Sequence, residues 1–342
     1  MSMIIHSNPS LPHFEGEVFP WIGGDLQTLR HYIARDVPGL PDGEEKTVTL
    51  EDGDTLMAAY HAPEGDIKGG IIAVHGLTGC MDSDHIKVLT RDALSRGFAV
   101  LRVNMRGAGP ARHLAKKSYN AKAGNDLLPF IGMMRTALKD KTGDDKTRPV
   151  VMVAHSIGGT AALNMMLDTP DKLDGLDGLV SIAAPIDMKA SNRRFHLPRN
   201  YVYMRHLLNG LKALADDVPE LDPDLLVKIK AVPSIKAFDD LYTGPMMGYQ
   251  DAMAYYEAAT TAHRLTAPVI PTLLIHGDND PWIPSDAYRA LTPSAHLDIA
   301  LSRGGGHVGF HDRKTYRGQD HHLRGVWSNR AVFAWIDQKF GG

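Results

Sequence analysis

The sequence contains a single cysteine, Cys80, among 342 residues. One cysteine excludes an intramolecular disulfide and a cysteine-rich metal site, and it fits a reducing compartment. Cys80 follows Gly79 near an expected helix start, where a reactive thiol is one interpretation and a small packing residue is the favoured one. The fold must therefore be stable without covalent cross-links, which a chain of this length allows.

Long apolar runs and an excess of charge of one sign are also missing. No apolar stretch approaches the roughly 20 residues that a membrane-spanning helix needs, and the N-terminal segment MSMIIHS lacks the basic and apolar parts of an export signal. The formal net charge is −3, with both signs interspersed, so no basic face for nucleic acid or anionic lipid is expected. We expect a cytoplasmic protein with no nucleic-acid partner and no stable membrane insertion. The sequence predicts no particular oligomeric state.

Motifs that bind metal ions are absent from the sequence as well. Its 17 histidines include no HExxH or HxH pattern, so neither a metal nor another cofactor is expected. Most of these histidines are predicted to be turn, packing or surface residues, among them His155, His311 and the pair His321–His322.

Apolar segments alternate with helical patterns along most of the chain. Such alternation, with strands that are apolar on both faces, predicts a mostly parallel central sheet covered by helices on both faces. The expected strands are residues 70–75, 98–104, 150–155, 178–184, 271–276 and 296–301, and the expected helices are residues 84–96, 126–138, 157–167, 285–291 and 324–340.

An antiparallel hairpin is expected before this alternation begins. Residues 46–50 and 55–60 read as strands, and they flank Glu51-Asp52-Gly53-Asp54, whose Asp-Gly pair is a strong turn signal. The sheet should therefore carry an N-terminal antiparallel hairpin.

The alternation stops between residues 187 and 267, a stretch rich in methionine, tyrosine and proline with helical patterns at 201–215 and 222–231. We predict an α/β core made of residues 1–186 and 268–342, interrupted once by a mostly helical cap at residues 187–267. A cap at this point of the chain would cover the carboxyl edge of the sheet, where open α/β folds bind ligands.

The expected strand 150–155 breaks abruptly on a serine, in Ala154-His155-Ser156-Ile157-Gly158. A buried strand, a tight turn and a helix lift a serine Oγ out of the sheet, where it can attack a substrate. Ser156 is the candidate nucleophile, although the pattern begins with alanine rather than the usual glycine.

A serine nucleophile needs a base within hydrogen-bond reach and a carboxylate that orients the base. After the strand 271–276, Asp280 is the favoured acid because Pro281 restricts its backbone, and Asp278 is the alternative. After the strand 296–301, a glycine-rich loop presents His307 as the candidate base. We attribute those glycines to a close approach of the loop to the nucleophile.

Ester chemistry also needs donors for the oxyanion of a tetrahedral intermediate. The backbone N–H of Ile157, directly after the serine, and the backbone N–H of Leu77, in the loop His75-Gly76-Leu77 after an expected strand, are the candidate donors. The order serine, aspartate, histidine matches the chain order of α/β-hydrolase triads.

With these motifs the chain resembles the YheT-like bacterial hydrolases, a subfamily of the α/β-hydrolase superfamily related to the ABHD1- and ABHD3-type proteins. The resemblance covers nearly the whole chain, and it implies an α/β-hydrolase fold and a triad of Ser156, Asp280 and His307. Ala154 departs from the glycine of many hydrolases, which affects the expected rate more than the chemistry. The segments that carry the resemblance are residues 20–29 (PWIGGDLQTL), 75–79 (HGLTG), 104–107 (NMRG), 238–240 (FDD), 305–310 (GGHVGF), and Gly248-Tyr249 to Tyr255-Tyr256.

The predicted function is a serine esterase that acts on a small-molecule ester through an acyl-enzyme intermediate. The resemblance implies short or medium acyl chains, with lipid esters as an alternative. Two other functions stay open: acyl transfer to an alcohol on the same triad, and a non-catalytic binding protein that kept the fold.

Overall fold

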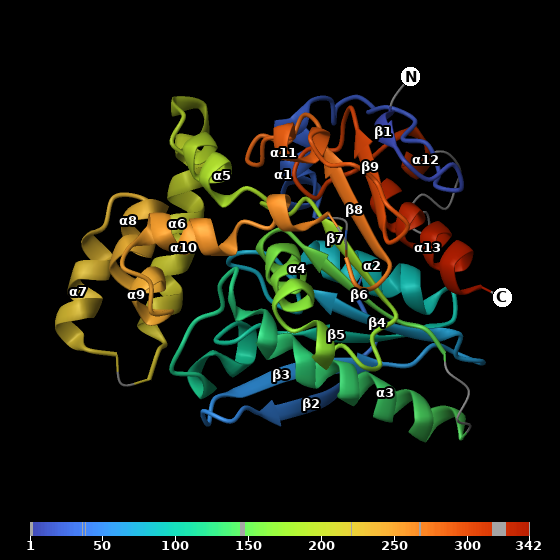
Figure 1. The fold of residues 1–342 in the computed structure, drawn as a ribbon, viewed down its shortest axis with the longest axis horizontal. Helices are drawn as coiled ribbons and strands as arrows, with labels where there is room; N and C mark the ends of the chain where they lie inside the picture. The colour runs from blue at the N-terminus through green and yellow to red at the C-terminus, as the bar shows by residue number, and fades with distance from the viewer. Residues whose placement is uncertain are drawn as a thin grey trace.

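A nine-stranded sheet forms the centre of the protein, in the order β1-β9-β8-β7-β6-β4-β5-β3-β2 (Figure 1). The computed structural model describes residues 3–35, 37, 39–143, 148–219, 221–266, 268–316 and 326–341. The strands are β1 (Met3–His6), β2 (Glu44–Thr49), β3 (Thr55–His61), β4 (Gly69–Val74), β5 (Phe98–Val103), β6 (Val150–His155), β7 (Gly178–Ile182), β8 (Thr272–Gly277) and β9 (Leu297–Ser302).

All neighbouring strands from β9 through to β5 are parallel. The predicted hairpin is confirmed, since β2 pairs antiparallel with β3, which in turn pairs antiparallel with β5. Gly53 closes the hairpin turn with a φ of 87°, a value that favours glycine. At the opposite edge, β1 pairs antiparallel with β9. The sequence patterns did not predict β1.

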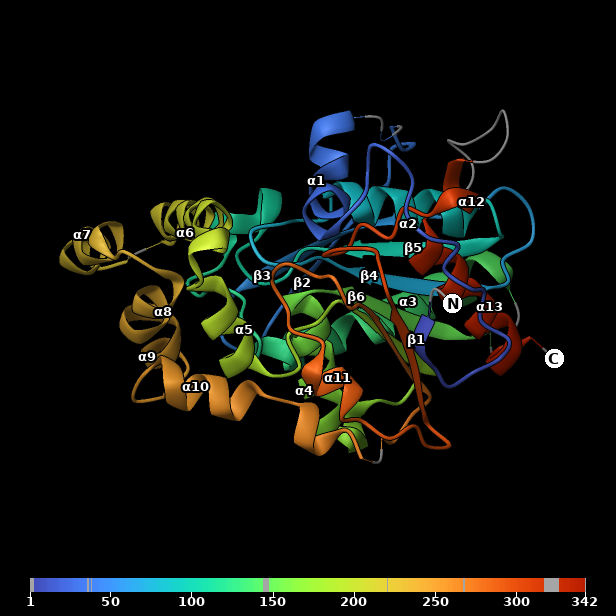
Figure 2. The ribbon, with the colours of Figure 1, turned by 90° about the horizontal axis from the view of Figure 1, so that it is seen from above.

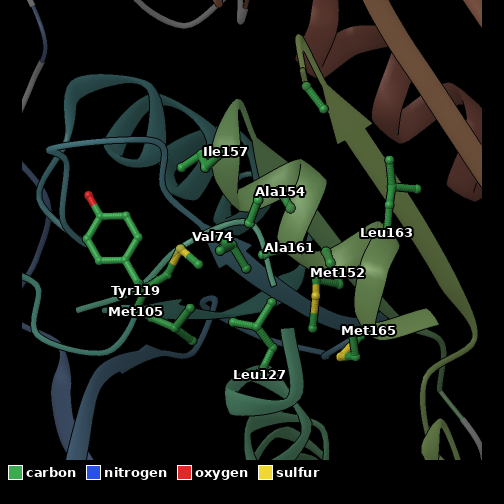
Figure 3. Packing of buried hydrophobic residues seen from close by; sticks show 14 of the residues in the cluster. Val74, Met105, Tyr119, Leu127, Met152, Ala154, Ile157, Ala161, Leu163 and Met165 are labelled. Atoms are coloured by element: carbon green, nitrogen blue, oxygen red, sulfur yellow. The ribbon is translucent and has the colours of Figure 1, made fainter. Parts of the chain in front are cut away.

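Helices cover both faces of the sheet and bury two separate cores. On β6, Val150, Met152 and Ala154 face one core while Val151 and Val153 face the other, which is why this strand has no polar side. Figure 3 shows Met152 and Ala154 among the residues of the first core. Helices α3 (Leu128–Thr142) and α4 (Ile157–Asp168) pack in the first core, and α2 (Asp84–Leu94) and α13 (Trp327–Phe340) pack in the second. The predicted fold class is confirmed.

Helix α1 (Gly24–Ala34) and several short helices complete the α/β part. The predicted helix 285–291 is reduced to α11 (Asp286–Arg289), while the predicted start of the last helix and the pair His321–His322 lie outside the described residues. The other short elements are η1 (Gly109–Leu114), η2 (Ala123–Leu127), η3 (Pro170–Lys172), η6 (Ala262–Arg264) and α12 (Arg313–Tyr316).

In the sequence, a group of helices follows β7 and precedes β8. This group occupies the left side of the molecule in both Figure 1 and Figure 2. Its elements are α5 (Met188–Phe195), η4 (Pro198–Asn200), α6 (Tyr201–Asp216), α7 (Pro223–Ala231), α8 (Ile235–Phe238), the π-helical turn η5 (Asp239–Thr243), α9 (Gly244–Met246) and α10 (Ala252–Ala259).

Polar side chains cap the starts of four of these helices. Asp187, Asp222, Ser234 and Asp251 each accept a hydrogen bond from a backbone N–H in the first turn of α5, α7, α8 and α10. Such caps define helix starts that an apolar pattern alone leaves open. Among the helices that the structure describes, none is both long enough and apolar enough to cross a membrane.

Candidate active site

Ser156 sits on a strained turn between β6 and α4. Its φ of 53° and ψ of −127° belong to a region that non-glycine residues rarely adopt. A Cβ atom on Gly158 would lie 2.2 Å from the carbonyl oxygen of His75, and one on Gly159 would lie 2.5 Å from Ser181 Oγ. The start of α4 therefore packs so closely on its neighbours that a side chain at either position would clash. Ala154, in the strand before Ser156, is fully buried.

Ser156, His307 and Asp280 form a continuous row of contacts. Ser156 Oγ lies 3.0 Å from His307 Nε2, and His307 Nδ1 lies 2.8 Å from Asp280 Oδ2. A carboxylate only accepts hydrogen bonds, so Nδ1 carries the proton and Nε2 is left to accept the serine proton. The three side chains come from the ends of β6, β8 and β9, which meet at the carboxyl edge of the sheet.

Asp280 is fully buried in this row. Burial raises the pKa of its carboxyl, but the His307 imidazole and further hydrogen bonds lower it by more, so the net pKa lies below its usual value. Its second oxygen accepts the backbone N–H groups of Trp282 at 2.7 Å and Ile283 at 3.0 Å. Asp280 is therefore a carboxylate held in one orientation.

Asp278, the alternative acid, is directed elsewhere. Its Oδ1 accepts a hydrogen bond from Ser285 Oγ at 2.5 Å and pairs with Arg289. Of the two candidates that the sequence left open, Asp280 is the one in contact with His307.

Aromatic rings flank both Asp280 and His307. Trp282 packs on His307 with ring centroids 4.3 Å apart, and His276 stacks on Tyr288 at 4.2 Å with nearly parallel planes. Burial lowers the pKa of His276 to about 4, so this imidazole stays neutral near Asp280. These rings restrict the movement of both groups, and sequence reasoning had assigned them no role.

Helix α1 supports the His307 loop from outside the α/β alternation. Thr28 Oγ1 accepts the backbone N–H of His307 at 2.8 Å, and Gln27 Oε1 accepts the N–H of His311 at 2.8 Å. The segment PWIGGDLQTL was part of the family resemblance, but its residues alone gave no signal of this contact. In the structure this segment holds the loop that carries His307.

Two glycines of the His307 loop, Gly306 and Gly309, face α1 rather than Ser156. A Cβ atom on Gly306 would lie 2.4 Å from the carbonyl oxygen of Gly24, and one on Gly309 would lie 2.3 Å from the carbonyl oxygen of Gln27. The predicted reason for these glycines thus needs correction, because they allow backbone-to-backbone packing against α1.

The loop after β4 runs directly beside Ser156. A Cβ atom on Gly76 would lie 3.0 Å from Ser156 Cβ. Within the described parts of the chain, the backbone N–H groups of Leu77 and Ile157 have no hydrogen-bond acceptor. Both candidate oxyanion donors are therefore available to a ligand.

His75 holds this loop in place. Its Nδ1 contacts the carbonyl oxygen of Gly76 at 2.8 Å, so this nitrogen donates, and its Nε2 accepts the N–H of Met105 at 3.0 Å. Burial lowers the pKa of His75 to about 4, so the neutral ring keeps both hydrogen bonds at neutral pH.

A cavity of about 490 Å³ opens onto Ser156 and His307. The α/β part and the helices between β7 and β8 both contribute to its wall, and most of the wall is apolar. The apolar part of the wall includes Leu77, Tyr119, Met188, Phe195, Leu207, Leu211, Leu214, Ile235, Phe238 and Trp282. Asp239, Thr243 and Tyr256 are among the polar residues that also line it.

The remaining candidates show local contacts. Cys80 is partly exposed, and its Sγ accepts the N–H of Asp82 at 3.4 Å in the turn before α2. His155 and His311 are buried as packing residues. Across the part of the chain that the structure describes, no three His, Cys, Asp or Glu side chains gather as a metal-binding group.

The fold and the site together define a hydrolase of the α/β class. Residues 71–314 match the family described as alpha/beta hydrolase fold, and the chain belongs to this family. It is 28% identical to the putative esterase YheT of Escherichia coli over 79% of this chain and 76% of that protein, which confirms the resemblance to YheT-like hydrolases.

Further relatives extend the comparison to lipases. The chain is 25% identical to the monoacylglycerol lipase of Saccharomyces cerevisiae over 76% of this chain and 60% of that protein. Among solved structures, a soluble variant of the monoglyceride lipase of S. cerevisiae in complex with a substrate analogue superposes with a TM-score of 0.54 at 15% identity, covering 88% of this chain and 96% of that one. At this identity the superposition shows the shared fold alone.

Proposed function

We propose that the protein is a serine esterase that cleaves carboxylic esters with Ser156 as nucleophile. The observation that carries this proposal is the row of contacts from Ser156 Oγ to His307 Nε2, at 3.0 Å, and from His307 Nδ1 to Asp280 Oδ2, at 2.8 Å. The names of its relatives, putative esterase and monoacylglycerol lipase, support the same class of reaction.

In the first half of the reaction, Ser156 Oγ attacks the ester carbonyl carbon while His307 Nε2 takes the serine proton. Asp280 keeps the imidazole in the required tautomer and stabilises its charged form. The negative oxygen of the tetrahedral intermediate accepts the N–H groups of Leu77 and Ile157, each worth about 3 kcal/mol in the transition state.

Collapse of this intermediate breaks the bond to the alcohol, which leaves with the proton from His307. Water then attacks the acyl-enzyme carbonyl, and His307 takes a proton from the water. The carboxylic acid leaves and Ser156 regains its proton, so atoms and charge balance over the cycle.

The apolar wall of the cavity supports an acyl chain of short or medium length as the substrate, and the lipase names among the relatives support lipid esters as the alternative. Residues of the helices that follow β7 and precede β8 in the sequence form part of that wall. We therefore propose a core of residues 1–186 and 268–342, with residues 187–267 acting as a cap that shapes the acyl site.

The experiment is a series of p-nitrophenyl esters from acetate to palmitate, hydrolysed by the wild-type protein and by Ser156→Ala. We expect kcat of the variant to fall by at least about 10³-fold on every ester that the wild type cleaves. A fluorophosphonate should label Ser156 in folded protein but not in urea-denatured protein. Hydrolysis that survives Ser156→Ala would overturn the proposal.

Product analysis separates the alternatives. If ethanol added to the reaction is converted mainly into an ethyl ester, the protein is an acyltransferase on the same triad. If no ester is cleaved and no label is taken up, the chain is a non-catalytic binding protein of this fold.

A further inference from the structure

The cavity contains a second polar group that the proposed reaction does not use. Asp239 lines the cavity from the π-helical turn η5, although only 8% of its surface is exposed. Tyr256 of α10 donates a hydrogen bond from its OH to Asp239 Oδ2 at 2.6 Å. Thr243, at the other end of the π-helical turn, lines the same cavity. π-Helical turns occur frequently at functional sites.

Asp239 has no cationic partner among the described residues. Lys236, a nearby cation, forms its ion pair with Asp240 instead. Burial raises the pKa of Asp239 to about 6, so near neutral pH the group is a carboxylate that only neutral hydroxyls of the protein contact. Buried carboxylates are normally paired or fully hydrogen-bonded. A ligand with a hydrogen-bond donor would complete this site.

A chain of contacts connects this group to the region of Ser156. Tyr255, next to Tyr256 on α10, accepts the backbone N–H of Ala121 with its OH at 2.9 Å. Tyr119, two residues before Ala121, contacts the carbonyl oxygen of Gly76 with its OH at 3.3 Å. The segment 119–121 therefore joins α10 to the loop beside the serine, and Asp239 and Ser156 face one cavity.

We propose that Asp239 and Tyr256 form a polar subsite that binds a hydroxyl group of the ester substrate, separate from the bond that is cleaved. The hydroxyl donates its hydrogen to the Asp239 carboxylate, while the rest of the substrate lies against the apolar wall. This inference rests on the proposed function, since it names a feature of the substrate of that same site.

The hydroxyl could be carried by the alcohol part or by the acyl part of the ester, and two matched pairs distinguish these sources. In the first pair, 2-hydroxyethyl hexanoate is compared with propyl hexanoate. In the second pair, propyl 6-hydroxyhexanoate is compared with propyl heptanoate. Each pair exchanges one hydroxyl for a methyl group at constant size, so the ratio of the two values of kcat/KM isolates the hydroxyl.

For at least one pair, we expect the wild type to prefer the hydroxyl compound by about tenfold. Asp239→Asn should reduce this ratio by about threefold, because the neutral amide is a weaker acceptor than a carboxylate. The double variant Asp239→Leu/Tyr256→Phe removes both polar groups of the subsite, and it should lose the preference completely. Asp240→Asn, which changes the neighbouring acid outside the cavity wall, should keep the wild-type ratio.

A structural role of Asp239 predicts a different result. If Asp239 only held α10 in place, its variants would lower kcat/KM for both members of a pair equally and leave the ratio unchanged. An unchanged ratio, or a wild type without preference in both pairs, overturns the subsite.

Binding measurements test the subsite without hydrolysis. In the Ser156→Ala background, calorimetry gives the dissociation constants of the same four esters, and the hydroxyl preference should again depend on Asp239. A preference in binding with no hydrolysis by the wild type would retain the subsite and count against the esterase. Equal dissociation constants within both pairs would count against the subsite alone.

Discussion

Asp280 Oδ2 lies 2.8 Å from His307 Nδ1, while Asp280 Oδ1 accepts the two backbone N–H groups that follow in its own loop. The turn after β8 thus orients the carboxylate independently of its contact with the imidazole. Asp278, two residues earlier in the same turn, pairs with Arg289. The turn therefore gives two chemically identical side chains different partners.

This difference predicts opposite results for two matched variants. Asp280→Asn should reduce kcat on p-nitrophenyl butyrate by about 10³- to 10⁴-fold, because an amide at this position favours the wrong tautomer of His307. Asp278→Asn should change kcat by less than about threefold, since it contacts neither His307 nor Ser156. Steady-state kinetics with circular dichroism as the folding control checks both. Equal losses in the two variants would contradict the assignment.

The close contact of α4 with β4 predicts a second matched pair. A methyl group on Gly158 would lie 2.2 Å from a backbone oxygen of His75, which cannot move as a flexible side chain could. Gly158→Ala should therefore destabilise the fold by about 1–3 kcal/mol and also reduce kcat, because it displaces the nucleophile. Urea unfolding measures the first effect and ester hydrolysis the second.

The control is Gly132→Ala in α3, where a Cβ atom would meet no other atom within 4 Å. This change should stabilise the protein by up to about 1 kcal/mol, because alanine has the higher helix propensity. If Gly158→Ala unfolded at the wild-type urea concentration, the tight packing of the nucleophile turn would be refuted.

The parallel strands could be predicted from the sequence because they are apolar on both faces, a pattern that few other elements share. Helix α1 could not be predicted, since it reverses the usual pattern: it buries Gln27 and Arg30 and exposes Tyr32 and Ile33. Its polar side chains bind the loop of His307 rather than an apolar core. Hydrophobic periodicity in a sequence indicates which residues bury apolar surface, so it does not detect a helix that buries polar side chains.

Ser156, Asp280 and His307 could be proposed from the sequence because each directly follows a recognisable strand, and the carboxyl ends of parallel strands share one edge. Asp239 has no such position. It lies in a helical turn between β7 and β8, and only the packing of α10 brings Tyr256 to it. Contacts of this kind depend on tertiary structure, which strand order does not determine.

Arg106 provides a third test, of stability rather than chemistry. The residue is 8% exposed. Its guanidinium binds Asp126 with two nitrogens at 2.7 Å, while the third nitrogen contacts Asp54 at 2.5 Å and Asp52 at 2.8 Å. A lysine keeps the charge but cannot reproduce this planar geometry.

Arg106→Lys should therefore lower the free energy of unfolding by about 3 kcal/mol, because one ammonium group cannot replace the contacts with the buried Asp54 and with Asp126 and Asp52 at the same time. Arg205→Lys is the control because Arg205 is exposed above the Tyr201 ring, and it should change stability by no more than about 0.5 kcal/mol. Urea titration followed by tryptophan fluorescence gives both values. Equal stability of the two variants would show that the guanidinium geometry is unimportant.

Buried histidines predict a loss of stability in mild acid. Burial lowers the pKa of His75, His155 and His276 to about 4, whereas an exposed histidine titrates near pH 6.5. As the pH falls below about 6.5, the unfolded chain binds these protons and the folded protein does not. Their stabilising contribution is therefore complete above pH 6.5 and is lost as the pH falls towards 4. Asp239, whose pKa burial raises to about 6, has the opposite effect on stability, because between pH 6 and 4 the folded protein binds its proton and the unfolded chain does not.

The free energy of unfolding should thus decrease steeply between pH 6.5 and 5, by about 1.4 kcal/mol per pH unit for each net proton taken up. Three histidines against one aspartate give a net uptake of about two protons. His61, whose pKa burial lowers to about 4, adds to this uptake, and so do His85 and His311, whose pKa values burial lowers further. Urea titrations at several pH values measure this slope. His276→Gln should reduce the slope by about one proton, because it removes one group that only the unfolded chain protonates. A free energy of unfolding that stays constant over this range would mean that these imidazoles bind protons equally in both states.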